Sequence, residues 1–212
     1  MYISLTIIYH CDTIFKVIYM YDIDKIKKDL KNILSDYRYE HSILVAEEAK
    51  KLANHYGIDE NKAYLAGLVH DIAKEFSNEE NIKWIEKGDL PKELLSDENI
   101  KIAHADIGAV FLKEKYIFDD DICSAVKYHT VGNVKMNLLA KIIFMADKFG
   151  RKKVDAFIEE LKEKAYKNID EAMLFFFIHQ QEEFDKKGKK LNSDALELMK
   201  YLKVVLNKSW VR

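Results

Sequence analysis

The sequence predicts an all-α fold: a single-domain helical bundle with extra helices toward the C-terminus. Only one proline and seven glycines occur in 212 residues, so few positions interrupt a helix. From residue 22 onward, apolar residues recur every three or four positions, which is the helical period. An apolar content of 49% and a charged content of 33% are ordinary for a globular chain that buries a sizeable core.

The composition also narrows the range of possible functions. The net charge of −2 provides no basic excess for nucleic acid, so we expect no nucleic-acid partner. The two cysteines, Cys11 and Cys123, form no disulfide framework, and a reducing cytoplasm is the expected location. The chain has no glycine-rich phosphate loop, no nucleophile motif and no zinc-type cysteine spacing. Any chemistry must therefore come from other residue types.

The first twenty residues differ from the rest, because they are apolar and β-branched until Asp12 and Lys16 interrupt them. Three interpretations compete: a strand or helix packed on the domain, a membrane-surface or signal-like segment, or upstream sequence outside the domain. The segment lacks the basic leader of a signal peptide, and its apolar run is too short to span a bilayer. We favour the third interpretation, with Met20 as the working start, a domain over 21–212 and no membrane partner.

The helices of the first third follow in order. A short amphipathic helix is expected over 24–34 and a second over 40–56, whose apolar positions keep the helical spacing. Gly57 stops the second helix, and Asp59 can cap the third. The third helix is expected to run to about Lys74. Because it is apolar nearly all round, it belongs in the middle of the bundle.

The remaining helices are separated by shorter breaks. A polar helix over 77–87 precedes an irregular region, 88–102, which contains the only proline. His104 opens the next helix, and the three aspartates at 119–121 start another, where carboxylates favour the helix dipole. A further helix carries Asp147 on its inward face. Beyond Arg151 we expect a basic, solvated turn at 186–190 and three C-terminal helices, at about 154–167, 170–184 and 193–206.

His70 and Asp71 end the very apolar stretch 63–69. Burying a histidine and a carboxylate costs free energy unless something binds them, and a metal ion is the commonest such partner. A lone histidine on an apolar face is usually a satisfied core or surface residue, and we interpret His10, His55 and His179 in that way. Six side chains on apolar helical stripes share the pattern and are better explained by a common partner: His41, His70, Asp71, His104, His129 and Asp147.

Four imidazoles and two carboxylates suit a borderline divalent metal such as iron, manganese, cobalt or zinc. Six ligands are more than one tetrahedral metal site needs. Adjacent helical residues point about 100° apart, so Asp71 is better placed than His70 to bridge two ions. We expect His41, His70, Asp71 and Asp147 around one ion, and Asp71, His104 and His129 around a second. Two ions roughly 3.5–4 Å apart can generate a hydroxide and neutralise a phosphate together.

The segments that carry these residues resemble the HD superfamily of metal-dependent phosphohydrolases over about residues 38–151. They are Arg38–Ser42, His70–Lys74, His104–Ala109, His129–Gly132 and Lys141–Asp147. Together they look like the YqeK-type branch of bacterial symmetrical dinucleoside tetraphosphatases. That resemblance implies a di-iron centre on the six residues, the splitting of diadenosine tetraphosphate into two ADP, and nucleotide contacts from Thr130, Gly132 and Arg38.

The sequence departs from this branch after Asp147. A Glu-Pro-x-Arg stretch is expected there, but the chain has a shorter loop in which Arg151 can take the arginine's role, and Asn133 replaces a usual basic residue. The expected mechanism is attack of a metal-bound hydroxide on a central phosphorus. Asp71 would bridge the ions, while Lys74 and Arg151 share the phosphate charge. Asp106 is expected in the first turn of its helix rather than against a ligand imidazole.

Two other functions stay open. One is a different HD-superfamily nucleotidase or phosphodiesterase, acting on dNMP, dNTP or a cyclic nucleotide. His104 and His129 argue against the single-metal alarmone hydrolases, and the absence of Gly-Tyr-Pro argues against the cyclic dinucleotide type. The other is a non-catalytic nucleotide sensor that has kept its metal, favoured only by the altered loop after Asp147. The C-terminal helices would cover the cleft, form a homodimer surface or complete the core.

Overall fold

The computed structural model describes residues 21–96 and 99–209, and the interpretations of 1–20 lie outside the described residues. Its regular elements in these ranges are all helices, so the all-α prediction is confirmed. They are α1 Ile23–Ile33, α2 Asp36–Tyr56, α3 Glu60–Val69, α4 Asn78–Lys87, the 3₁₀ helix η1 Lys92–Leu95, α5 Ile100–Tyr116, α6 Asp120–Tyr128, α7 Leu138–Phe149, α8 Ala156–Lys167, α9 Ile169–Lys186 and α10 Ser193–Ser209. Within the described ranges, no helix combines the length and the hydropathy that a membrane span requires.

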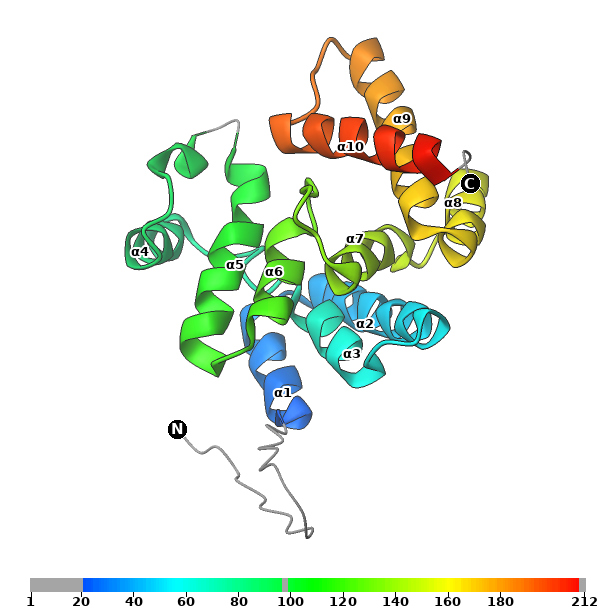
Figure 1. The fold of residues 1–212 in the computed structure, drawn as a ribbon. Helices are drawn as coiled ribbons and strands as arrows, with labels where there is room; N and C mark the ends of the chain where they lie inside the picture. Colours follow the sequence, from blue (N-terminus) through cyan, green and yellow to red (C-terminus); the bar gives the residue numbers. More distant parts are fainter. Residues whose placement is uncertain (1–20, 97–98, 210–212) are drawn as a thin grey trace, which may run out of the picture.

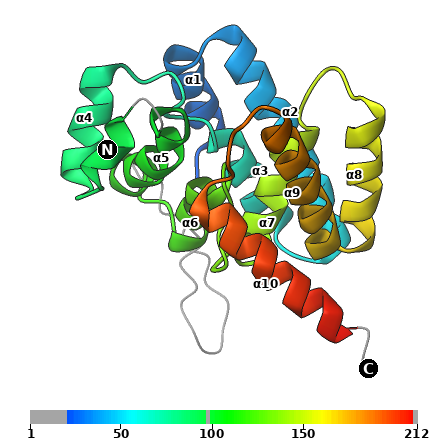
Figure 2. The ribbon, with the colours of Figure 1, turned by 90° about the horizontal axis from the view of Figure 1, so that it is seen from above.

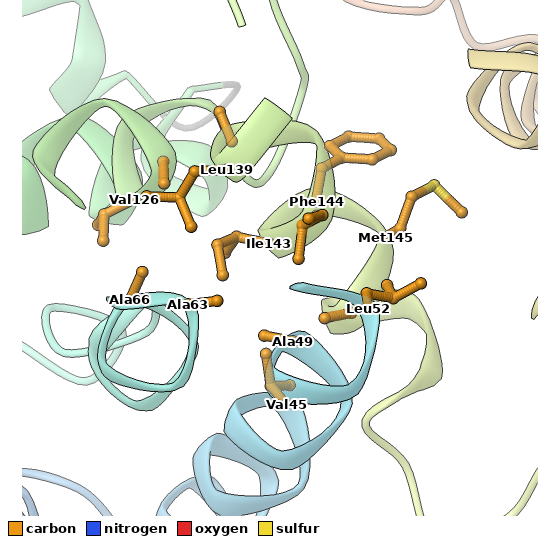
Figure 3. Close-up of a cluster of buried hydrophobic side chains, with 14 of the residues drawn as sticks. Val45, Ala49, Leu52, Ala63, Ala66, Val126, Leu139, Ile143, Phe144 and Met145 are labelled. Atoms are coloured by element: carbon orange, nitrogen blue, oxygen red, sulfur yellow. The ribbon is translucent and has the colours of Figure 1, made fainter. Parts of the chain in front are cut away.

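Helix α7 lies at the centre of the molecule. It packs against α2, α3 and α6, and also against α8 and α9 (Figure 1). Figure 3 shows how Ile143 of α7 faces Ala49 of α2 and Ala63 of α3 across the core. All three residues are fully buried. A helix that is apolar on nearly every face belongs in such a position, where it is covered from several directions.

Helices α2 and α3 approach each other closely because the residues between them are small. A Cβ added to Gly67 of α3 would lie 2.9 Å from Ala46 Cα in α2. Ala49 of α2 and Ala66 of α3 are also fully buried at this contact (Figure 3). Small side chains let helix backbones come near, and the approach carries the two helix ends that hold His41 and His70 to the same place.

The three largest differences from the predicted helix boundaries lie at α2, α3 and α5. Helix α2 begins at Asp36 because Ser35 caps it: the Ser35 Oγ accepts from Arg38 N at 3.4 Å. Helix α3 ends at Val69 rather than Lys74, since Ile72 N donates to Val69 O in a tighter, 3₁₀-type turn. Helix α5 begins at Ile100, so His104 lies in its second turn, not at its start. That extra turn packs Ala103 into a small apolar cluster with α4.

The C-terminal helices complete the core. Helix α9 packs on α7, where the Phe144 and Phe177 rings lie 5.4 Å apart between centroids. Helix α10 packs on α9, and Figure 2 shows it running past the ends of α6 and α7. Leu198 of α10 is buried as well. These helices therefore share one hydrophobic core with α2, α3, α6 and α7.

Candidate metal centre

The structure brings all six side chains predicted as ligands to one place, although they come from separate helices. His41 lies in the second turn of α2, His104 in the second turn of α5, and Asp147 near the end of α7. His70 and His129 directly follow the last residues of α3 and α6, and Asp71 comes one residue later. The six residues thus lie at helix ends or within the first two turns, where several helices can direct side chains to one point.

Asp71 lies at the middle of this cluster, with its two carboxylate oxygens facing different histidines. The Oδ1 atom is 3.1 Å from His104 Nε2 and 3.5 Å from His129 Nε2. The Oδ2 atom is 3.6 Å from His70 Nε2 and 4.0 Å from His41 Nε2. The carboxylate therefore joins two groups of donors. Both groups have the spacing of a metal site: His41, His70 and Asp71 form one, and Asp71, His104 and His129 form the other.

Asp147 completes the first group. Its Oδ1 atom lies 3.1 Å from His41 Nε2 and 3.5 Å from His70 Nε2. The other oxygen, Oδ2, accepts from Lys148 Nζ at 2.7 Å. Asp147 thus points one oxygen toward the cluster and the other toward a cation, which fixes its orientation.

The four imidazoles are all held by backbone carbonyls. His70, His104 and His129 each donate from Nδ1 to the carbonyl three residues earlier, those of Gly67, Lys101 and Val126, at 2.8, 3.1 and 2.6 Å. His41 donates from Nδ1 to Gly150 O at 2.6 Å. A carbonyl oxygen only accepts, so each Nδ1 carries a proton and each ring turns its Nε2 inward.

These inward nitrogens fit a cation. His70 Nε2 is fully buried and has no hydrogen-bond partner. The Nε2 atoms of His104 and His129 face each other at 3.2 Å, which leaves two lone pairs opposed. Buried polar atoms are normally paired, and carbonyl-anchored imidazoles beside carboxylates are typical of metal ligands. The donor set therefore fits the divalent metals that HD domains bind.

The electrostatics of the cluster support the same interpretation. Burial alone would raise the pKa of Asp71, but the neighbouring histidines outweigh it and hold the carboxyl well below its usual range. Asp147 behaves in the same way, with Lys148 and His41 opposing burial and lowering its pKa. Burial lowers the pKa of His104 to about 4. His70 differs: burial opposes its charged form, but Asp71 and Asp147 outweigh burial and raise its pKa. A divalent metal bound there would take the place of that proton between the two carboxylates.

Cationic side chains surround the cluster. Arg38 Nη1 donates to Asp71 Oδ2 at 3.2 Å, and the Lys74 ammonium lies 3.3 Å from the His104 ring nitrogens. Burial lowers the pKa of Lys74. A cavity of about 310 Å³ borders His41 and is also lined by Arg151 and Tyr37. The predicted cations Arg38, Lys74 and Arg151 thus all lie beside the cluster.

Thr130 and Gly132 follow His129 but lie in different surroundings. Thr130 lines a second cavity, of about 770 Å³. Gly132 is buried with φ of 73°, and a Cβ there would meet Leu198 Cδ2 at 2.6 Å. Its close approach to α10 explains the glycine. Asp106 lies inside α5 and pairs with Lys127 at 3.4 Å, so the prediction that it occupies a first helical turn was wrong.

Sequence reasoning missed the backbone groups of the site. Gly150 gives the carbonyl that holds His41, and a Cβ at this position would lie 2.4 Å from Val45 Cγ2. The turn is tight: Arg151 N donates to Phe149 O at 2.7 Å, with Gly150 at φ −69° and ψ 57°, an inverse γ-turn. In the sequence, the only sign of this turn is the glycine shortly after Asp147. A glycine there is equally well explained as the end of a helix.

The chain belongs to the HD domain family, whose model matches residues 38–152. It is 34% identical to the symmetrical bis(5'-nucleosyl)-tetraphosphatase of Bacillus subtilis (strain 168), over 68% of this chain and 78% of that protein. The protein of the same name from Staphylococcus aureus (strain NCTC 8325 / PS 47) is also 34% identical, over 68% and 75%. These relatives confirm the resemblance inferred from the sequence.

The fold has a close counterpart among solved structures. A crystal structure described as a predicted HD superfamily hydrolase involved in NAD metabolism, from Clostridium acetobutylicum, superimposes with a TM-score of 0.77 and is 33% identical. The match covers 86% of this chain and 97% of that one. It extends well beyond the residues of the HD family match, so the C-terminal helices belong to the shared fold.

Proposed function

We propose that this chain is a symmetrical bis(5'-nucleosyl)-tetraphosphatase, which hydrolyses diadenosine tetraphosphate to two ADP. The relatives that carry this name match two thirds or more of the chain. The observation that carries the proposal is the Asp71 carboxylate, whose two oxygens face separate histidine groups, with Arg38, Lys74 and Lys148 in contact with members of the cluster. That arrangement suits a substrate with several adjacent phosphates.

The proposed ligands form two sets that share Asp71. His41, His70, Asp71 and Asp147 would hold one divalent ion, and Asp71, His104 and His129 a second, with iron as the first candidate and manganese, cobalt or zinc as alternatives. When bound, such a pair supplies Lewis acidity that activates water and offsets phosphate charge. The carbonyl-anchored imidazoles keep the Nε2 atoms in place for this role.

The surrounding cations would orient the substrate. Arg38 reaches Asp71 with a planar guanidinium that can bind phosphate oxygens at two points. Lys74 and Lys148 lie on either side of the cluster, against His104 and Asp147. Together they would balance the negative charge of a polyphosphate chain laid across both ligand groups. Asp71 and Lys74 are thus the proposed catalytic residues, and Arg38, Thr130 and Arg151 the proposed substrate contacts.

We also propose that residues 21–212 act as one domain in the cytoplasm. Helices α8–α10 share the buried core of α7, so they would not fold apart from it.

The deciding experiment combines metal analysis with product identification. The purified protein should contain transition metal and convert diadenosine tetraphosphate into ADP alone. With ¹⁸O-labelled water, the label should enter only one of the two ADP molecules formed in each turnover. Equal amounts of AMP and ATP would rule out symmetrical cleavage. A panel of nucleoside monophosphates, triphosphates and cyclic nucleotides tests the other HD-superfamily activities, and tight nucleotide binding without turnover would identify a sensor instead.

A further inference from the structure

A cavity of about 770 Å³ lies beside the candidate metal centre, and much of its lining comes from outside the HD family match of 38–152. One wall is the first turn of α5 and the loop after α6, which contains Thr130. The other is the end of α9, the α9–α10 turn and the start of α10. Figure 1 shows the start of α10 above the tip of the loop after α6. Asn133 and Asp194 join these two segments, with Nδ2 donating to Oδ2 at 3.1 Å.

We propose that this cavity binds one nucleoside diphosphate half of the substrate, and that the α9–α10 turn provides its recognition. The inference rests on the proposed function. The cavity lies near the Asp71, His104 and His129 group: Thr130 directly follows His129 in the chain, although none of these three residues lines the cavity. Lys101, another lining residue, gives the carbonyl that holds His104. A phosphate chain crossing that group would therefore lead into this space.

Two lysines of the turn are available for phosphate. Lys189 and Lys190 line the cavity, are exposed, and have no ion-pair partner in the described ranges. Lys186 and Lys187, only a few residues earlier, both pair with Glu183. The turn between them is made by Gly188 in the left-handed region, at φ 63°. The charge of Lys186 and Lys187 is thus partly balanced by one carboxylate, whereas Lys189 and Lys190, which face the cavity, keep their full charge.

The other lining groups suit a nucleoside. Phe184 is half-buried at the end of α9 and provides an aromatic face on which a base can stack. Gln180 adds an amide, which both donates and accepts hydrogen bonds, as the edge of a base requires, and Asn192 adds a second amide whose Oδ1 already accepts from Asp194 N and whose Nδ2 can donate. An aromatic face, two amides and two unpaired lysines together match a nucleoside 5'-diphosphate better than an inorganic anion.

The smaller cavity beside His41 supports this assignment. It borders the other ligand group and again combines an aromatic ring, Tyr37, with cations, Arg151 and Lys153. A cavity of this chemistry therefore lies near each ligand group, while a third cavity, of about 450 Å³, is lined by His104 and Lys74 themselves. A substrate with a nucleoside at both ends would place one in each, and its middle phosphates would then lie over Asp71.

The charge of the turn can be tested with two matched double variants. Lys189→Gln with Lys190→Gln should raise KM for diadenosine tetraphosphate about tenfold and leave kcat within about twofold, with a weaker dependence on salt. Lys186→Gln with Lys187→Gln removes the same charge from the same turn but from outside the cavity. Its KM should stay within about twofold of the parent. Equal effects of the two double variants would overturn the proposal.

The aromatic face is tested with Phe184→Leu and with adenosine 5'-tetraphosphate, which lacks one nucleoside. The parent enzyme should prefer the dinucleotide, and Phe184→Leu should reduce that preference about tenfold, the scale of one base stacked on one ring. Phe175→Leu is the control, since Phe175 also lies on α9 but stacks on Phe157. Melting curves establish that both variants fold. An unchanged preference in Phe184→Leu would contradict the proposed base site.

A wrong proposed function and a wrong cavity assignment give different experimental results. If the metal-loaded parent turns over no dinucleoside tetraphosphate, the proposed activity is wrong, and calorimetric titration with ADP then tests the cavity alone. Affinity for ADP should fall about tenfold in the Lys189→Gln and Lys190→Gln double variant but not in its control. Equal affinities, or no ADP binding by the parent, would overturn the cavity assignment.

Discussion

Asp71 is the residue on which both ligand groups depend, because no other side chain in the described ranges belongs to both. Asp71→Asn keeps the size of the side chain but removes its charge and one acceptor oxygen. We expect the metal content to fall by at least half, and kcat/KM to fall by about 100-fold or more, as for loss of a bridging ligand. Elemental analysis and steady-state kinetics measure the two effects.

Asp106 gives the matched control for that substitution. It is a largely buried aspartate on α5 that pairs with Lys127, and burial raises its pKa. Asp106→Asn should therefore leave the metal content unchanged and alter stability by no more than about 1 kcal/mol. Metal loss of the same size in both variants would mean that Asp71 acts through folding rather than ligation.

Cys123 lies away from the candidate metal centre, and the reactivity of its thiol gives a pH-dependent test of how deeply it is buried. Burial raises the pKa of its thiol to about 11 from an ordinary value of 9.0. At pH 8 the thiolate fraction should then be about 100-fold lower than in the unfolded chain, and the thiol should react slowly with an aromatic disulfide reagent. The measurement uses Cys11→Ser, so that only Cys123 reacts, and urea-unfolded protein as the reference.

The raised pKa of Cys123 also fixes the sign of the change in the free energy of unfolding at alkaline pH. Between about pH 9 and 11 the unfolded chain loses the Cys123 proton while the folded chain keeps it. The unfolded state binds fewer protons in that window, so the free energy of unfolding falls as the pH rises. Cys123→Ser should flatten this part of the pH profile. An equally steep profile in the serine variant would contradict the assignment.

At the scale of the helices, the contact between α2 and α3 sets the position of the centre. Gly67→Ala would place a methyl 2.9 Å from Ala46 Cα, and backbone cannot easily move aside. We expect a loss of about 1–3 kcal/mol in the free energy of unfolding, together with weaker metal binding, because His70 follows on the same helix. Urea unfolding and metal titration measure the two consequences.

Gly108 is the matched control for this contact. It lies within α5, and an added Cβ would meet only side chains, the nearest at 3.4 Å from Val126 Cγ1. Gly108→Ala should be neutral or stabilising by up to about 1 kcal/mol, the helix-propensity difference between the two residues. If both alanine variants behaved alike, close packing of α2 on α3 would not explain the glycine at position 67.

Helices and their ends differ in how well the sequence predicts them. Gly57 and Asp59 marked a helix end and a cap correctly, because a left-handed glycine and a capping carboxylate act locally. The start of α5 was misplaced because its first turn is held by packing against α4, which the sequence does not display. The end of α3 was misplaced because a change to 3₁₀ geometry leaves no compositional mark.

The candidate site likewise contains features that the sequence shows and features that only the fold reveals. The six side chains were found because buried polar residues on apolar stripes are visible in a sequence. The carbonyls of Gly67, Val126 and Gly150 were not, since every residue has a carbonyl and only the fold selects one. In the sequence, Lys189 and Lys190 are visible only as part of a basic turn. That they line the same cavity as Thr130 depends on how α10 packs, which the sequence does not show.

At the scale of the whole molecule, the proposed metals would join five helices, α2, α3, α5, α6 and α7. Removing them with a chelator should therefore lower the melting temperature of the entire chain in one transition. A ligand present at 100 times its dissociation constant stabilises the folded state by about 2.7 kcal/mol. Calorimetry before and after chelation, and after metal is restored, measures the effect. The shift should shrink in Asp71→Asn, and an equal shift in that variant would place the responsible metal elsewhere.

The bond from His41 to the Gly150 carbonyl has a consequence for synthesis. The two residues are 109 positions apart, and the carbonyl belongs to a turn that closes only after α7 has formed. A nascent chain that has not yet released residue 150 from the ribosome has His41 without its orienting partner and without Asp147. Loading of the proposed metal at His41 would therefore have to follow the emergence of α7 from the ribosome.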